Sequence, residues 1–266
     1  MPKIIWSQHG DAGPPVLLIM GLTMPGRVWR PQLKTLPNQH QVITYDHRGL
    51  GDSAGTDDWF SIADMARDAL RVLDEAEWPT AHVVGVSMGG MIAQELAIAA
   101  SDRLRSLTLI ATHGGGPITW LPRYQGLRGL LAAASGDRER RTKGLERMLY
   151  PPDWVATQDR ADFLSSLEDR LAYRAPRATA LRQIRAVSRH RTIERLKSVG
   201  TRTLVVQPGK DALIDPRNSE TLAKVLPNSE LVRFPDAGHG IIHQEADALN
   251  ARLLAHFAAC ESALAG

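Results

Sequence analysis

Short apolar runs rich in β-branched residues recur along the chain and are separated by polar or amphipathic stretches. Runs of this length with few polar positions are typical of parallel strands that are buried on both faces. We expect such strands at residues 16–20, 41–45, 82–86, 107–110, 203–207 and 230–234. Several intervening stretches carry apolar residues at helical spacing, and residues 61–75 are the clearest example, with Ser61 and Asp64 placed to cap the helix. The alternation predicts an α/β fold with a mostly parallel, doubly wound sheet.

The alternation stops after residue 110 and resumes at residue 203. A glycine-rich turn at residues 114–117 opens the intervening stretch, which is arginine-rich, helix-prone and interrupted by prolines. An insertion at this position would lie over the carboxyl ends of the strands, where open α/β sheets bind their ligands. We therefore expect a core formed by residues 1–113 and 196–266, with residues 114–195 inserted as a helical lid. A solvated helical decoration whose arginines pair with nearby acids is the alternative.

Composition narrows the class of protein. A chain of 266 residues can fold without disulfides or metals, and its one cysteine, Cys260, has no companion for a disulfide or a metal site. The net charge of +3 is too small to indicate a nucleic-acid partner, and no apolar run is long enough to span a membrane. We expect a cytoplasmic protein with no metal or cofactor and with neither a nucleic acid nor a membrane as partner. Nothing in the sequence indicates an oligomeric state.

Residues 85–89 read Gly-Val-Ser-Met-Gly, a G-x-S-x-G pattern between a predicted strand and a helix-like run. A chain that turns directly from a strand into a helix strains its apex residue, and glycines on both sides remove the side chains that would collide there. The turn therefore makes Ser87 the candidate nucleophile. A flexible small-residue loop without chemistry is the alternative, so the rest of the chain has to supply a base and an acid.

The candidate base is His239, which follows the predicted strand at residues 230–234. It lies between Gly238 and Gly240, as an imidazole in a tight loop requires, whereas a histidine of the core would usually lie inside a periodic segment. His243, four residues further on in a predicted helix, is the competing histidine.

The candidate acid is Asp211, just past the carboxyl end of the predicted strand at residues 203–207. Its position gives the order serine, acid, histidine along the chain. Asp215 is a rival, but it precedes Pro216 and suits the start of a helix. Asp236 ranks last, because side chains three positions apart in a turning loop seldom align as acid and base.

Backbone N–H groups are the expected donors to a negatively charged oxygen. Met88 opens the helix after the serine, and Leu22 lies in the loop after the first predicted strand, where Gly21 lets the backbone turn. Asp46 and Arg48, which follow the second predicted strand, are expected to pair with each other and to bond the backbone of neighbouring loops. These two residues would support the site without taking part in the chemistry.

Taken together, these residues resemble the α/β-hydrolase family from about residue 16 to the end, apart from the lid. Residues 85–89 match its nucleophile elbow, and residues 46–53 match its D-x-R-G-x-G-x-S segment. Residues 87–94 are similar to esterases, enol-lactonases and cofactor-free perhydrolases, and residues 18–21 with 45–48 are similar to methylesterases. A serine at the apex argues against dehalogenases and epoxide hydrolases, which use aspartate there. Many members have His-Gly where this chain has Met20-Gly21, so a histidine that supports this loop is expected to be absent.

The resemblance implies an α/β-hydrolase fold and a serine hydrolase, a carboxylesterase or lactonase, that cleaves small to medium esters or lactones through an acyl-enzyme on Ser87. Cofactor-free perhydrolysis or C–C bond hydrolysis by the same residues is the alternative, and a non-catalytic ligand receptor is a third class. The expected substrate contacts are Gly21, Trp120, Tyr124 and Leu213. Trp29 is a further candidate for a pocket wall, with core packing as its alternative.

Overall fold

The strands in the described part of the protein form one seven-stranded sheet in the order β1-β3-β2-β4-β5-β6-β7. The computed structural model describes residues 2–55, 57–115, 124–133, 135–167 and 172–265. All six predicted strands are confirmed and run parallel. They are β2 (Pro15–Ile19), β3 (Gln41–Tyr45), β4 (Ala81–Val86), β5 (Leu104–Ile110), β6 (Thr203–Pro208) and β7 (Ser229–Phe234). The antiparallel edge strand β1 (Trp6–His9) was not predicted, because it lacks an apolar run.

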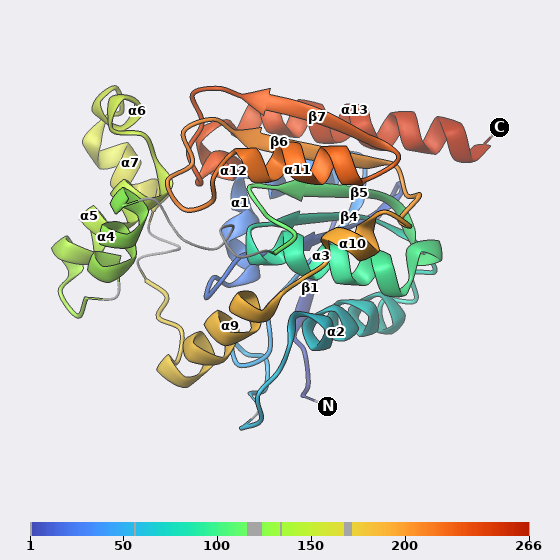
Figure 1. Ribbon diagram of the computed structural model, residues 1–266, viewed down its shortest axis with the longest axis horizontal. Helices are drawn as coiled ribbons and strands as arrows, with labels where there is room; N and C mark the ends of the chain where they lie inside the picture. Colours follow the sequence, from blue (N-terminus) through green and yellow to red (C-terminus); the bar gives the residue numbers. More distant parts are fainter. Residues whose placement is uncertain (1, 56, 116–123, 134, 168–171, 266) are drawn as a thin grey trace.

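Helices cover both faces of the sheet, as the doubly wound prediction requires (Figure 1). On one face, Leu17 and Ile19 of β2 join a first core cluster with residues of α2 (Ile62–Glu75) and α3 (Met88–Ala99). On the other face, their neighbours Val16 and Leu18 join a second core cluster. That second cluster includes Trp29 and residues of α12 (Ile241–Gln244) and α13 (Ala246–Ala265). Leu33 of α1 (Arg30–Leu33) packs against it. Trp29 is fully buried there, so it belongs to the core and is not a pocket wall.

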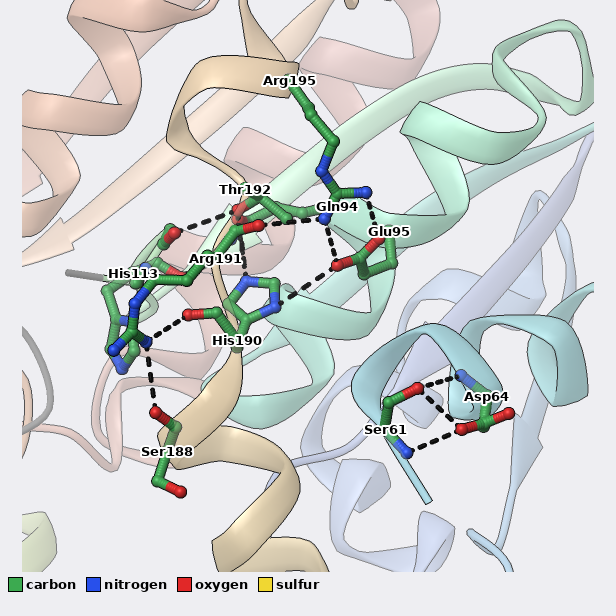
Figure 2. A network of polar contacts seen from close by, with 12 residues as sticks. Ser61, Asp64, Gln94, Glu95, His113, Ser188, His190, Arg191, Thr192 and Arg195 are labelled. Atoms are coloured by element: carbon green, nitrogen blue, oxygen red, sulfur yellow. Dashed lines mark hydrogen bonds and ion pairs between the residues drawn. The ribbon is translucent and has the colours of Figure 1, made fainter.

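The start of α2 has the predicted cap. Ser61 Oγ accepts a hydrogen bond from the Asp64 N–H at 3.1 Å, and the Asp64 carboxylate accepts from the Ser61 N–H at 2.7 Å (Figure 2). Two N–H groups that the helix leaves without intrahelical partners are satisfied in this way.

Helices fill the segment between β5 and β6. The described ones are α4 (Tyr124–Ala133), α5 (Arg138–Leu149), α6 (Pro152–Ala156), α7 (Arg160–Ser166), α9 (Arg177–Arg189) and α10 (Ile193–Leu196). Figure 1 shows α4 to α7 grouped beyond the carboxyl ends of the strands, where Leu145, Phe163 and their neighbours form a separate insertion cluster. Ala186 of α9 and Leu196 of α10 pack in the first core cluster instead. A separate lid bounded at residues 114 and 195 stays a prediction.

No helix in the described part of the chain combines the length and the apolar character that crossing a membrane requires. Across the same residues, no group of three or more His, Cys, Asp or Glu side chains is arranged to hold a metal ion.

A buried polar network ties the two ends of the inserted segment to α3 (Figure 2). The Thr192 N–H donates to the Gly114 carbonyl at 2.8 Å, and the Thr192 hydroxyl donates to Gln94 Oε1 at 2.6 Å. Gln94 Nε2 in turn donates to the His113 carbonyl at 3.2 Å. Since Gln94 lies on the helix that begins directly after Ser87, the two connections to the insertion are fixed to the helix that carries on from the candidate nucleophile.

Acidification is expected to destabilise the protein through His113 and His190 of this network. Burial, the largest cause, lowers the pKa of His113 to about 4 and that of His190 to about 3. In the unfolded chain both rings titrate at about pH 6.5. Below that pH the unfolded state therefore binds more protons than the folded state. The neutral rings therefore contribute their full stabilisation above about pH 6.5, and this contribution is lost as the pH falls toward the pKa values of the folded state. We expect a loss of about 1–2 kcal/mol per histidine at pH 5, measured by urea unfolding at pH 7.5 and pH 5.

His190→Gln provides the control for this prediction. Glu95 lies 3.7 Å from His190 Nδ1, but its carboxylate is bound by the Arg195 guanidinium at 2.6 and 2.8 Å, and the positive charges of Arg195 and Arg191 lower the pKa of His190 further. Protonation of His190 is therefore opposed both by burial and by its charged surroundings. The variant should lose at least about 1 kcal/mol less than the parent between the two pH values, and an equal loss would contradict the assignment.

Candidate active site

Ser87 stands at the apex of the turn between β4 and α3, with a φ of 57° and a ψ of −121°. A non-glycine residue rarely adopts this backbone conformation, so the turn is strained. A Cβ on Gly85 would lie 2.3 Å from the Gly89 carbonyl oxygen, and one on Gly89 would lie 2.0 Å from the Ile19 carbonyl oxygen. Only glycine fits at these two positions, which is the physical basis of the G-x-S-x-G pattern.

The structure brings the three side chains predicted from separate loops into one hydrogen-bonded chain. His239 Nε2 lies 3.1 Å from Ser87 Oγ, and His239 Nδ1 lies 2.7 Å from Asp211 Oδ2. The other carboxylate oxygen, Asp211 Oδ1, accepts from the backbone N–H groups of Leu213 and Ile214 at 2.8 and 2.9 Å. Asp211 and His239 are both buried. With a proton on Nδ1 facing the carboxylate, Nε2 is free to accept the serine proton.

The rival residues are engaged elsewhere. The Asp215 carboxylate accepts from the Arg217 N–H at 2.9 Å and pairs with the Arg217 guanidinium, at the start of α11 (Arg217–Val225). That helix begins one residue later than expected, with Pro216 as its N-cap. Asp236 is exposed and lies 2.9 Å from Lys210. The His243 ring packs edge-on against Tyr150.

The loop after β2 lies directly against the serine. A Cβ on Gly21 would be 3.3 Å from Ser87 Cβ and 3.8 Å from Ser87 Oγ, so Gly21 permits the close approach and Leu22 follows it. Met88 is the first residue of α3, and its N–H has no acceptor within the helix. Leu22 thus follows a residue that lies against Ser87, and Met88 follows Ser87 itself, while their role as donors stays a prediction.

A histidine does support this loop, contrary to expectation. His47 Nε2 lies 2.8 Å from the Met20 carbonyl oxygen. Burial is the main cause that lowers the pKa of His47, which favours the neutral ring, and a neutral ring reaches a carbonyl by donating its N–H. The sequence placed no role on this residue, although it lies inside the segment at residues 46–53 that matches the family.

Part of the supporting role expected of that segment is corrected. Asp46 Oδ1 accepts from the Gly26 N–H at 2.7 Å and so bonds a neighbouring loop as expected. Arg48, however, pairs with Asp68 on α2 at 2.6 Å and donates to the Asp64 carbonyl at 3.1 Å. Arg48 therefore fastens the segment to a helix, because its long side chain reaches a buried carboxylate on α2.

The inserted helices contact the three loops that carry His239, Asp211 and Leu22. The Leu149 carbonyl at the end of α5 accepts from the Gly240 N–H at 2.7 Å, next to His239. Asp153 of α6 lies 2.6 Å from Lys210, the neighbour of Asp211. Gln183 Oε1 of α9 accepts from the Thr23 N–H at 2.8 Å, in the loop of Leu22.

The predicted substrate contacts are only partly placed. Gly21 lies against Ser87, as described above. Leu213 is half-buried on the Asp211 loop, where it packs against the insertion cluster. Trp120 lies outside the described residues, and Tyr124 begins α4 with a side chain that is also outside the described part. The role of these four residues in binding stays a prediction.

An open depression of about 690 Å³ lies elsewhere, near the first residues of β5, β6 and β7. Arg105, Arg202 and Cys260 are among its lining residues. In a parallel sheet this is the edge opposite to Ser87, which follows the end of β4. The depression therefore has no part in the site.

Comparison with known proteins defines the class. A family model described as alpha/beta hydrolase fold matches residues 14–246. A relative from Azorhizobium caulinodans named "Putative carbamate hydrolase RutD" is 36% identical over 250 residues, covering 92% of this chain and 91% of the relative. The chain belongs to the α/β-hydrolase family, and its activity is that of a hydrolase.

Solved structures agree on the fold. An enol-lactonase from Burkholderia xenovorans is 19% identical with a TM-score of 0.82, covering 97% of each chain. A thermophilic esterase from Thermogutta terrifontis is 20% identical with a TM-score of 0.81, covering 97% of this chain and 94% of its own. At these identities the likeness shows the fold alone.

Proposed function

We propose that the protein is a serine hydrolase of small to medium carboxylic esters or lactones, with Ser87 as nucleophile, His239 as base and Asp211 as the acid that orients it. The observation that carries the proposal is the hydrogen-bonded chain from Ser87 Oγ through His239 to Asp211. A serine on a strained elbow, a base within hydrogen-bond reach and a buried carboxylate behind the base form the arrangement that activates a hydroxyl.

In the proposed reaction, Ser87 Oγ attacks the substrate carbonyl carbon while its proton passes to His239 Nε2. The negative charge that develops on the carbonyl oxygen is held by the N–H groups of Leu22 and Met88. The tetrahedral adduct collapses to an acyl-enzyme, and the alcohol leaves with the proton from His239. Water then attacks the acyl carbon and gives its proton to His239, which returns it to Ser87 as the carboxylic acid departs. Every step uses groups of the chain itself.

Carbamates are a second candidate substrate class, which the printed name of the Azorhizobium caulinodans relative supports. A carbamate presents the same carbonyl carbon, so the same residues would form a carbamoyl-enzyme on Ser87. The nitrogen lone pair makes this carbonyl less electrophilic than that of an ester. The perhydrolase, C–C hydrolase and ligand-receptor alternatives stay predictions.

We propose further that residues 114–195 act as a lid that selects the substrate. The contacts of α5, α6 and α9 with the loops of His239, Asp211 and Leu22 support this role. Contacts between the substrate and the lid would thereby change the positions of the loops that carry the reacting groups.

Trapping the covalent intermediate tests the proposal. Mixing the protein with excess p-nitrophenyl acetate and quenching in acid should add one acetyl group to the peptide that contains Ser87, detected by mass spectrometry. Parallel reactions with a p-nitrophenyl N-methylcarbamate should give a carbamoyl adduct on the same peptide if carbamates are substrates. An adduct on a different residue, or ester turnover that Ser87→Ala leaves unchanged, would exclude the assignment.

A further inference from the structure

Gln183 of α9 reaches the loop that carries a predicted oxyanion donor. Thr179, Gln183 and Ala186 are the buried positions of this helix, and Gln183 is fully buried. Its Oε1 accepts from the Thr23 N–H at 2.8 Å, across 160 positions of sequence. Because only the amide oxygen can accept from an N–H, this bond also fixes which way the amide group is turned.

The bond falls on an unfavourable stretch of backbone. Thr23 has a φ of 60°, a left-handed conformation that is costly for a β-branched residue. The Thr23 hydroxyl donates to the Leu22 carbonyl at 2.7 Å, and the Met24 N–H donates to the Gly21 carbonyl at 3.4 Å, which completes the turn. The direction of the Leu22 N–H depends on this turn, so whatever holds Thr23 at positive φ also orients Leu22.

We propose that Gln183 is a positioning residue for the oxyanion hole: its Oε1 holds Thr23 in the left-handed conformation and so aims the Leu22 N–H at the developing oxyanion. This inference rests on the proposed function. In this proposal α9 of the insertion helps to position a group that takes part in catalysis, in addition to its packing against the core.

The contacts of α9 separate this role from simple docking of the helix. A Cβ on Gly49 would lie 2.6 Å from Thr179 Oγ1, so Thr179 packs closely on the loop after β3. Arg182 donates to the Asp57 carbonyl at 2.9 Å, and Ala186 packs in the first core cluster. These contacts are independent of Gln183 and should keep α9 in place without it.

Stability of the fold alone does not explain why position 183 carries a glutamine amide. Gln183 Nε2 is buried and has no partner among the described residues. A buried donor without an acceptor costs stability, whereas an apolar side chain of the same shape would not. Methionine matches glutamine in length, so Gln183→Met removes the Thr23 contact and the unpaired donor together.

The test compares Gln183→Met with Arg182→Gln, which weakens a docking contact of the same helix. For Gln183→Met we expect kcat for a p-nitrophenyl ester to fall about tenfold or more, a smaller effect than complete loss of a donor, with KM changed less than about twofold. Phosphonylation of Ser87 by a fluorophosphonate should slow by the same factor. The thermal midpoint should stay within a few degrees of the parent, because loss of the unpaired Nε2 donor offsets the loss of the Thr23 acceptor. Arg182→Gln should leave kcat within about twofold of the parent.

A second part of the test uses Thr23→Gly, because glycine adopts positive φ without strain and needs no bond from Gln183 to hold it there. We expect Gln183→Met to cost less in the Thr23→Gly background than in the parent. Full activity of Gln183→Met, or an equal loss in both backgrounds, overturns the inference, as does a loss that Arg182→Gln reproduces. If Ser87→Ala is inactive while Gln183→Met is fully active, only this inference fails; if Ser87→Ala stays active, the proposed function fails.

Discussion

Ser87→Ala is expected to lower turnover of a p-nitrophenyl ester at least about a thousandfold. Alanine keeps the elbow but removes the hydroxyl that His239 deprotonates. No acyl-enzyme can then form, and only binding and the oxyanion donors remain to accelerate direct attack by water. The measurement is initial-rate kinetics with p-nitrophenyl acetate, together with fluorophosphonate labelling, which should disappear.

Ser262→Ala is the matched control, since Ser262 is an exposed serine on α13 whose hydroxyl donates to the Ala258 carbonyl. It should keep the activity and labelling of the parent. Both variants should unfold at the temperature of the parent to within a few degrees. Activity of Ser87→Ala above one tenth of the parent would show that another group attacks the carbonyl.

Asp211→Asn is expected to lower kcat by roughly 10³ to 10⁴ with little change in KM. The asparagine side chain can still accept from the N–H groups of Leu213 and Ile214 through its oxygen, so the loop should keep its shape. Its NH₂ group then faces His239 Nδ1 and needs an acceptor there, which moves the imidazole proton to Nε2. In that tautomer His239 cannot take the proton of Ser87. Steady-state kinetics at pH 7 to 9 measure the loss.

Asp215→Asn is the control, because it makes the same chemical change in the same loop. Asp215 pairs with Arg217 at the start of α11, away from the hydrogen-bonded chain, so we expect a change in kcat of less than about twofold. An equal loss in Asp215→Asn and Asp211→Asn would mean that the acid has been assigned to the wrong carboxylate.

The strands and the elbow could be predicted because their causes are local. A parallel strand buried on both faces is predominantly apolar, and β2 shows this most clearly in sequence, with shorter apolar runs at residues 83–84 in β4 and 204–206 in β6. The edge strand β1 is half-exposed and reads Trp-Ser-Gln-His, so its pairing with β3 depends on a neighbour that the local sequence does not reveal. Gly85 of the elbow is likewise required by a contact with Gly89, four residues on, whereas Gly89 is required by the Ile19 carbonyl oxygen at the end of β2.

Contacts between side chains that are distant in sequence could not be predicted from the local pattern. Arg48 was expected to pair with Asp46, its neighbour in sequence, but it pairs with Asp68 on α2. His47 supports the Met20 carbonyl, and Gln183 reaches Thr23 from the insertion. Neither residue stands in a pattern of its own, because a polar side chain can satisfy its hydrogen bonds with any partner that the fold brings near.

The sequence by itself determined six of the strands and their alternation with helices, the serine turn and the loops that carry Asp211 and His239, since each follows from a pattern within a short stretch of chain. Only the tertiary structure decided that these loops meet within hydrogen-bond distance, and that Leu149, Asp153 and Gln183 of the insertion fasten the loops of the site. The physical reason is that such contacts join elements up to 160 positions apart, and their geometry is set by packing of the whole sheet and its helices.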